Sequence, residues 1–428
     1  MKRGFTLIEL LAVIVILAII ALIATPIVLD IIEDSKESAN IQSINSLVDM
    51  AEMYATTNET TGNLYDKVID KIEGSKPDNG VVYVNKKGEV ALALKYNNKC
   101  YVKAYDSNKI TQSKDENCIV PVDYLMVVDT TNGETQKVFN SEITKSQVEK
   151  IITVSTNEVP VDVIESFDVT ENQNGSIMAW YKDEDNNGLY ELYIGQDGGV
   201  KANPDSTKLF NFYINVTIMD LSNLDTSNVT NMFVMFQRCE KLQNLDLSSF
   251  DTSNVTNMNA MFNNCYDLQI LNLKGFDTKN VIEMQKTFQG LKSLENLDLS
   301  SFNTSNVTNM KGMFANCEKL SDIKMSNFDV SNVTNMMAIF QNCKSLQTLD
   351  LSNFNIETIE DVSYMFQNTI NLKTINMNKA DFTKATIYDG MFQGSGVTNI
   401  TVKDEITKTF IEARLTDESI TGATITIG

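Results

Sequence analysis

Glu9 is the ionisable residue with the most unusual surroundings in this sequence of 428 residues. It lies near the start of an apolar stretch, and residues 10–29 form a run of 20 residues without a charge. At about 1.5 Å per residue, a helix of that length crosses a bilayer core of about 30 Å. A carboxylate in such a segment is costly, so it is expected to have a partner and a function. The segment itself supplies no partner for Glu9.

Enzymatic chemistry is restricted by the absence of histidine from the whole sequence. Ser-His-Asp and Cys-His catalysis are excluded, and the commonest metal ligand is missing. Carboxylate acid/base chemistry stays open, but among 56 acidic residues no pair stands out. The net charge of −21 becomes −23 without Lys2 and Arg3, and such a surface repels nucleic-acid phosphates. We therefore expect no catalytic residue, no cofactor and no nucleic-acid partner.

One acidic segment imitates a metal site. Asp183, Asp185, Asn187 and Gly188 match the first half of a calcium-binding loop. The twelfth position, which requires a bidentate glutamate, is Ile194. The sequence therefore favours a hairpin turn over a metal site here, and no metal is predicted.

The six cysteines form two groups. Outside the membrane, Cys100 and Cys118 would close a disulfide loop that contributes about 3 kcal/mol, and two reduced, partly buried thiols are the alternative. The other four share one position of a repeat in which Leu291 and Thr369 also occur, which favours buried thiols over disulfides or a metal ladder. These four are Cys239, Cys265, Cys317 and Cys343.

The elements that position Glu9 begin with a basic leader, residues 1–4, followed by the apolar run. A secretory signal would end in an A-x-A site, which residues 21–24 do not supply. The stretch from residue 2 to 10, KRGFTLIEL, resembles the start of type IV prepilins and pseudopilins.

That resemblance implies cleavage between Gly4 and Phe5 by a membrane prepilin peptidase, followed by N-methylation of Phe5. It also implies that the Glu9 carboxylate meets the N-terminal amine of a neighbouring subunit, which is the missing partner. A plain single-pass anchor with an incidental glutamate is the alternative.

A long helix is predicted after the leader. Apolar residues continue at helical spacing beyond the charge-free run, as in Ile44, Leu47 and Ala51. Residues 5–56 are therefore predicted to form one transmembrane and amphipathic helix, which is the shape of a pilin.

Two β-rich regions are predicted next. Residues 57–120 are expected to form a pilin-like head, a small meander with strands at 81–84, 90–96 and 100–105. Residues 121–208 are expected to form a connecting region with strands in 122–129, 150–156 and 159–169 and a hairpin around Asn187. Trp180, the only tryptophan, is expected to lie in a core.

An internal repeat with a period of 26 residues occupies residues 209–402. In one unit Leu245 and Leu247 alternate around a polar residue, and Met258, Met261 and Phe262 stand at helical spacing. This pattern predicts a short strand and a short helix in each coil. Neither buries its apolar face alone, so the coils are expected to stack into a parallel solenoid. Residues 403–428 break the period and are predicted to cap the stack.

The LxxLxL pattern and the period are typical of leucine-rich repeats. The phrase LDLSSFDTSNVTNMNAMFNNC also resembles the BspA-type repeats of bacterial surface proteins, and the resemblance covers residues 160–428. The predicted fold is multidomain α+β, with a long membrane helix, a small β-meander head and a leucine-rich-repeat solenoid.

Recurrent side chains of the repeat have structural explanations. The Met-Phe pairs are expected in the core. Asn-Val-Thr, a glycosylation sequon, recurs at Asn228, Asn254, Asn306 and Asn332, but stacked asparagines that hydrogen-bond the turns explain the recurrence better. An exposed sheet row is polar and identifies no ligand: Asp246, Asn272, Asp298, Lys324, Asp350 and Asn376.

These features predict a non-enzymatic protein of the bacterial cell membrane, with extracellular domains on the cell surface or a pilus. It would be a minor pilin or pseudopilin that displays its repeats for adhesion. Its expected partners are the membrane, a prepilin peptidase, other pilin subunits with their assembly platform, and an unidentified extracellular protein or glycan. A pseudopilin of a secretion or competence machine is the alternative, and a displayed carbohydrate-active enzyme is the third.

Overall fold

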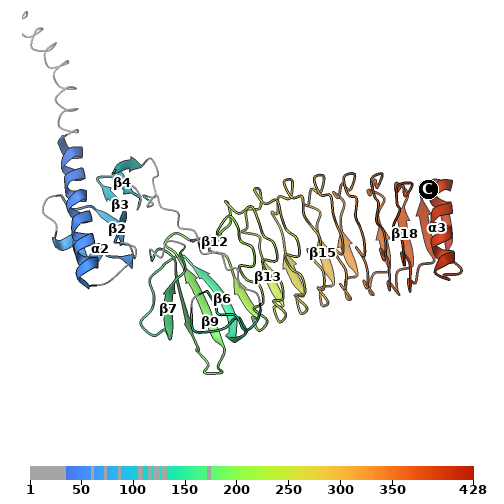
Figure 1. The fold of residues 1–428 in the computed structure, drawn as a ribbon, viewed down its shortest axis with the longest axis horizontal. Coiled ribbons are helices and arrows are strands. Elements are labelled where there is room, and N and C mark those ends of the chain that lie inside the picture. The colour runs from blue at the N-terminus through green and yellow to red at the C-terminus, as the bar shows by residue number, and fades with distance from the viewer. Residues whose placement is uncertain are drawn as a thin grey trace, which may run out of the picture. The chain divides into compact units, whose positions relative to one another are not determined.

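The computed structural model describes residues 35–58, 62–71, 75–84, 88–104, 109–113, 118, 126, 133–139, 141–170 and 175–428. These residues form few helices and many strands in several sheets (Figure 1). The chain separates into two compact units, Met1–Asp123 with Asn172–Gly175 and Tyr124–Glu171 with Ser176–Gly428. Gly4, Phe5, Glu9 and the charge-free run lie outside the described residues. In the described part of the chain, no helix is both long and apolar enough to span a bilayer.

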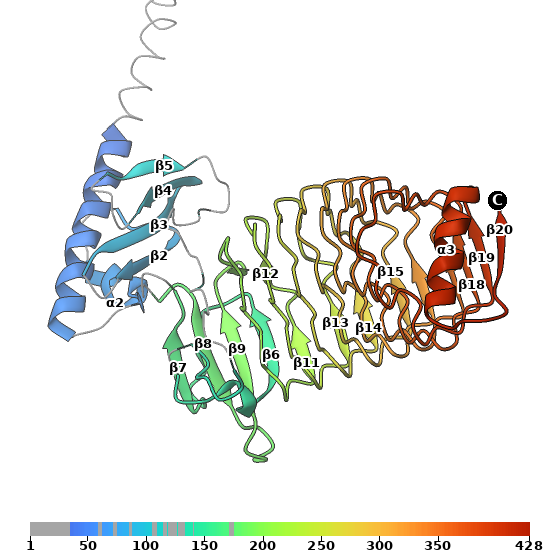
Figure 2. The same cartoon turned by 45° about the vertical axis from the view of Figure 1, so that its right-hand side comes forward.

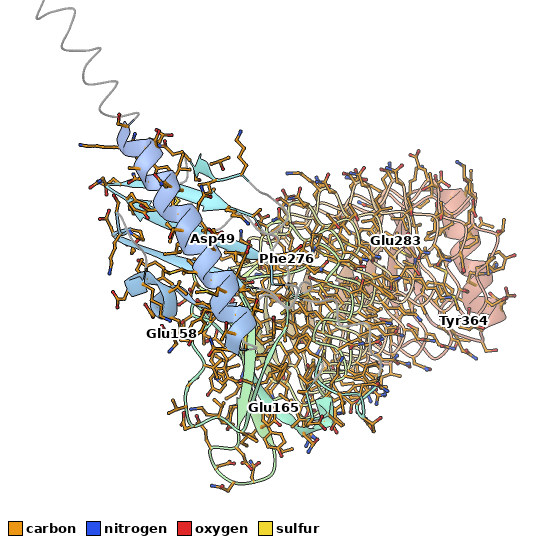
Figure 3. All side chains as sticks on the ribbon, turned by 60° about the vertical axis from the view of Figure 1, so that its left-hand side comes forward. Asp49, Glu158, Glu165, Phe276, Glu283 and Tyr364 are labelled. Carbon is orange, nitrogen blue, oxygen red and sulfur yellow. A yellow bond between two sulfur atoms is a disulfide. The ribbon has the colours of Figure 1, made fainter. Side chains whose placement is uncertain are left out.

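In the first unit a helix packs on an antiparallel sheet. Residues 35–58 are helical, and Asp49 lies on the exposed side of this helix (Figure 3). The sheet has the order β1-β2-β3-β4-β5, with β1 Gly62–Asn63, β2 Asn79–Val84, β3 Val90–Tyr96, β4 Lys99–Lys103 and β5 Thr111–Ser113. The predicted meander is therefore confirmed as β2, β3 and β4.

The helix and this sheet share one hydrophobic core. The helix buries Ile44, Leu47 and Ala51, which recur every three or four residues on one face, against the alternating apolar residues of β2 and β3. Two short helices follow β1, namely α2 (Tyr65–Val68) and η1 (Ile69–Lys71).

The second unit begins with a mixed sheet of order β11-β6-β9-β8-β7. Its strands are β6 Val148–Val154, β7 Glu165–Asp168, β8 Met178–Lys182, β9 Tyr190–Gly195 and β11 Ile218–Asp220, preceded by the 3-10 helix η2 (Lys145–Gln147). The antiparallel pair β8 and β9 is the predicted hairpin. Trp180 is buried, as predicted, with its ring stacked on that of Tyr193 at 5.8 Å.

Parallel pairing then joins successive coils of the chain (Figure 2). Single bridges link residues 26 apart, namely Asp205, Asn231, Asn257, Glu283, Asn309, Asn335, Asp361 and Ile387. The preceding pair, β10 (Val200–Lys201) with β12 (Leu224–Asp225), is also parallel. We name residues 205–402 the repeat stack.

Short strands form a second column of the repeat stack. They are β13 Asn244–Asp246, β14 Ile270–Asn272, β15 Asn296–Asp298, β16 Asp322–Lys324, β17 Thr348–Asp350, β18 Thr374–Met377 and β19 Asn399–Val402. Leu245 lies opposite Leu271 and Leu297 opposite Ile323, which confirms the predicted register of 26 residues.

The prediction of a short helix in each coil is wrong. Residues 258–264 form turns, in which the Met261 N–H donates to the Met258 carbonyl at 3.2 Å. Ala260 and Asn264 have φ angles of 54° and 63°, which an α-helix does not contain. Consecutive turns also bring residues three and four apart to one side of the chain. The buried side chains were therefore predicted correctly, although the predicted backbone conformation was wrong.

The turns persist because alternate amides hydrogen-bond to the next coil. Ala260 N–H donates to the Gln285 carbonyl at 2.8 Å, and Asn264 N–H donates to the Gln289 carbonyl at 2.8 Å. A helix would use the same amides within its own coil. The second residue with a positive φ angle in these turns is mostly asparagine or glycine, the two residue types that tolerate that conformation. These residues are Asn264, Gly290, Asn316, Asn342, Asn368 and Gly394.

A column of buried threonines also holds neighbouring coils together: Thr226, Thr252, Thr278 and Thr304. The Thr278 hydroxyl donates to the Asn303 carbonyl at 2.9 Å and accepts from the Asn303 N–H at 2.8 Å. One hydroxyl therefore satisfies both backbone groups of a residue in the next coil.

Thr278→Val keeps the shape of the side chain and removes both bonds. We expect it to lower the free energy of unfolding of the repeat stack by about 1 to 3 kcal/mol, since two backbone groups lose their partner. Urea denaturation followed by circular dichroism measures the loss. Thr308→Val, the same change at an exposed position, is the control, and equal losses in the two variants would contradict the bridging role.

The segment after the repeat stack contains a helix and a strand, as predicted. Helix α3 (Glu405–Asp417) begins at Asp404, whose carboxylate accepts from the Thr407 N–H at 2.8 Å. It buries Ile411 and Leu415 against the last coils. Strand β20 (Thr424–Ile427) continues the sheet in parallel with β19.

Candidate binding surface

Cys100 and Cys118 form a disulfide in the first unit, with their Cα atoms 5.2 Å apart. Cys100 lies in β4, and Cys118 follows β5, which pairs with β4. The bond therefore ties the chain after the last strand of the head back to the head's own sheet.

The acidic segment at 183–188 is a turn whose carboxylates are used by its own backbone. The Asn187 N–H donates to Asp183 Oδ1 at 3.0 Å and to Asp185 Oδ1 at 3.2 Å, and the Gly188 N–H donates to Asp183 Oδ2 at 3.2 Å. Among the described residues, no group of three or more histidine, cysteine, aspartate or glutamate side chains is placed to hold a metal ion.

The four cysteines of the repeat are buried free thiols, and Leu291 and Thr369 are equally buried at the same position of their coils. The Cys317 thiol donates to the Phe288 carbonyl at 3.0 Å. Burial raises the pKa of Cys317 to about 12. Thiols in this state pack as small apolar groups and are poor nucleophiles.

The polar sheet row predicted from the sequence pairs with itself across neighbouring coils. Asn272 Nδ2 donates to Asp246 Oδ1 at 2.9 Å, and Lys324 Nζ lies 3.2 Å from Asp298 Oδ2. Asn376 Nδ2 likewise donates to Asp350 Oδ1, at 3.1 Å. The aspartates also accept from serine amides two residues later, and these bonds hold the pKa of Asp246 below its usual value. The row therefore contributes to the stability of the stack through bonds between its own side chains.

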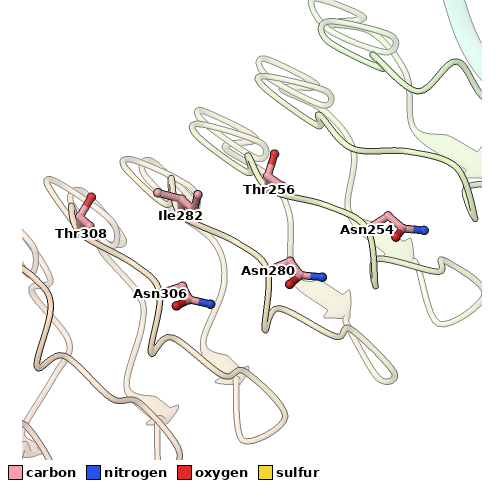
Figure 4. Close-up of a pocket in the computed structure, with 6 residues that line it drawn as sticks. All are labelled: Asn254, Thr256, Asn280, Ile282, Asn306 and Thr308. Atoms are coloured by element: carbon pink, nitrogen blue, oxygen red, sulfur yellow. The ribbon is translucent and has the colours of Figure 1, made fainter.

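A different face of the repeat stack carries a shallow groove lined by six residues of three successive coils (Figure 4). We name it the Asn–Thr groove, and it consists of two rows, Asn254, Asn280 and Asn306 beside Thr256, Ile282 and Thr308. Residues of each row are 26 apart in the sequence, so one coil supplies one member of each row.

The asparagine row has a fixed orientation. Asn254 Nδ2 donates to the Ser227 carbonyl at 2.8 Å, and Asn280 Nδ2 donates to the Ser253 carbonyl at 2.7 Å. Asn306 Nδ2 repeats the bond with the preceding coil, at 2.7 Å. The prediction that stacked asparagines hydrogen-bond the turns is confirmed at these positions. Each side-chain amide uses one of its two N–H groups in this bond, so its second N–H and its Oδ1 atom remain for other contacts.

The second row of the groove combines hydroxyls with one apolar side chain. The Thr256 hydroxyl donates to the Thr230 carbonyl at 3.1 Å, so it also presents its lone pairs. Ile282 is 46% exposed in the middle of the row. None of the six lining residues is charged, although the chain has a net charge of −21.

Sequence reasoning treated the Asn-Val-Thr phrase as a turn signal and did not identify the groove. The recurrence of Asn and Thr two residues apart in successive repeats was visible. Without the turn geometry, nothing in the sequence showed that both side chains face the same side.

Two family models match the chain. The prokaryotic N-terminal methylation motif matches residues 1–25. The family described as "Mycoplasma protein of unknown function, DUF285" matches residues 205–323 and 283–404, which is the repeat stack. No curated protein matches the chain. The chain is thus similar to prepilin-type proteins at its N-terminus and to a repeat family over the stack.

Proposed function

We propose that this protein is a minor pilin-like subunit that carries a leucine-rich-repeat solenoid on the bacterial surface and uses it for adhesion or protein binding. The observation that supports this most is the N-terminal methylation motif at residues 1–25, joined in one chain to a regular stack of coils. The motif implies processing by a prepilin peptidase and association with the pilin assembly machinery.

The character of the second unit supports display rather than catalysis. The thiols of the repeat are buried, and the polar sheet row is paired internally. A rigid stack of this kind holds side chains of successive coils in fixed rows, which suits recognition of an extended ligand. We therefore infer a binding function without chemistry.

Shearing the cells tests the proposal. We expect the protein to copurify with surface fibres and to begin at an N-methylated Phe5, which mass spectrometry of the terminal peptide identifies. Recovery only in the membrane fraction, with Met1 intact, would contradict the pilin-like role. Processing without release by shearing would instead favour the pseudopilin of a secretion or competence machine.

Gly4→Leu tests the processing step by itself. The resemblance to prepilins requires a small residue before the cleaved bond, so the variant is expected to accumulate in the membrane at full length. Immunoblotting and terminal-peptide mass spectrometry measure the ratio of the two forms. Lys2→Arg, which keeps the leader basic, should be processed as the unchanged chain is.

A further inference from the structure

We propose that the Asn–Thr groove binds an uncharged polysaccharide chain that runs along the stack from coil to coil. This inference rests on the proposed function, because it names the class of ligand that the displayed repeats would hold. Four features of the groove support it.

The first feature is the absence of charge. The six lining residues are asparagine, threonine and isoleucine. Lys279, which precedes Asn280 in the sequence, is paired with Asp277 at 2.7 Å. The chain has a net charge of −21, so as a whole it attracts cations and repels anions. A groove lined by uncharged residues does neither and therefore suits a neutral ligand.

The second feature is a row of uncharged hydrogen-bonding groups. Asn254, Asn280 and Asn306 each use one Nδ2 hydrogen in a bond to the preceding coil, which leaves a row of Oδ1 acceptors and one N–H donor on each amide. The Thr256 hydroxyl is also directed at a carbonyl. A ligand that fits must therefore both donate and accept hydrogen bonds, and sugar hydroxyls are uncharged groups that do both and repeat along a chain.

The third feature is repetition. Neighbouring strands of a sheet are about 4.8 Å apart, so the coils offer the same pair of side chains at steps of that length. Figure 4 shows the two rows side by side over three coils. At the centre Ile282 replaces threonine and supplies an apolar contact, which suits the C–H face of a sugar ring.

The fourth feature favours a glycan over an extended peptide. A peptide commonly adds to an open backbone edge, but the backbone of this row is used by the stack itself. The Thr256 N–H donates to the Thr230 carbonyl at 2.8 Å, and the Ile282 N–H donates to the Thr256 carbonyl at 2.9 Å. In the row that contains Thr256 and Ile282, the side chains are therefore the groups left to recognise a ligand.

Ile282→Glu is the decisive variant, because it places a carboxylate at the centre of the groove without removing a hydrogen bond. The matched control is Ile270→Glu, the same change at a more exposed isoleucine in β14, on the sheet column of the stack. The full chain in detergent micelles is titrated with dextran, mannan and soluble cello-oligosaccharides. Polygalacturonate represents acidic glycans, and gelatin represents extended peptides.

We expect at least one of the neutral glycans to bind, and Ile282→Glu to weaken that binding by about tenfold or more while Ile270→Glu stays within about twofold. The matching free monosaccharide should compete poorly, because one ring contacts one coil. Three outcomes overturn the proposal: no neutral glycan binds, gelatin or polygalacturonate binds more tightly, or both variants weaken binding equally.

Copurification with sheared fibres is measured separately. A protein that is found on fibres but fails this titration therefore refutes the groove assignment and leaves the proposed function standing.

Discussion

Phe314→Ala is expected to lower the free energy of unfolding of the repeat stack by about 3 to 5 kcal/mol. The side chain is fully buried, and its ring stacks between those of Phe288 at 5.8 Å and Phe340 at 5.5 Å. Alanine would remove the apolar contacts with both neighbouring coils and leave a cavity, because rings held in register by the backbone cannot move in to fill it.

Urea denaturation followed by circular dichroism measures the effect of Phe314→Ala. Phe233→Ala is the control, because that side chain belongs to the same stack but is only half-buried. Its loss is expected to be clearly smaller. If the two variants lose the same stability, the aligned phenylalanines are not a main source of cohesion between coils.

The period of the repeat could be predicted from the sequence because each coil buries the same kinds of side chain at the same positions. Phe236, Phe262 and Phe288 recur every 26 residues and stack ring on ring at 5.7 Å. Ring-on-ring stacking of this kind favours the same residue type at the equivalent position of the next coil. That constraint determines both the core and the register, and both were predicted correctly.

The backbone between the core positions was less predictable. Met258, Met261 and Phe262 fit helical spacing, yet Ala260 and Asn264 adopt positive φ angles. Hydrogen bonding between coils outweighed helix propensity, because each turn amide that reaches the next coil donates to a carbonyl there, with N to O distances of about 2.8 to 3.0 Å. The pattern of apolar residues alone does not distinguish a helix from consecutive turns that bury the same residues.

The predicted strand over residues 159–169 was too long. Only Glu165–Asp168, strand β7, pairs with β8. Pro160 has no N–H to donate, and Val161 and Ile164 are exposed. Apolar residues indicated a longer strand, but the pairing with β8 starts at Glu165, next to Ile164, whose N–H donates to the Tyr181 carbonyl at 3.0 Å.

Glu9→Gln is expected to reduce incorporation into sheared fibres sharply while cleavage after Gly4 continues. In a filament the apolar helices pack together away from water, so an ionised carboxylate needs a cation nearby. Under the proposed function, the methylated but still protonated amine of Phe5 on an adjacent subunit would be that cation, and the methylation motif at residues 1–25 supports this assignment. Glutamine keeps the shape of the side chain and removes only its charge.

The size of the effect follows from leaving the Phe5 amine without its partner. Breaking one side of a desolvated ion pair typically costs about 3 to 5 kcal/mol, which is a factor of more than a hundred in an equilibrium. A few surface contacts between heads could not restore that loss, so the ratio of fibre-bound to membrane-bound protein, measured by immunoblot after shearing, should fall in proportion. Glu33→Gln, the same change in the polar segment after the charge-free run, controls for loss of charge alone. Unchanged incorporation of Glu9→Gln, with processing intact, would mean that Glu9 has no partner in the fibre and that the N-terminal segment acts as a simple anchor.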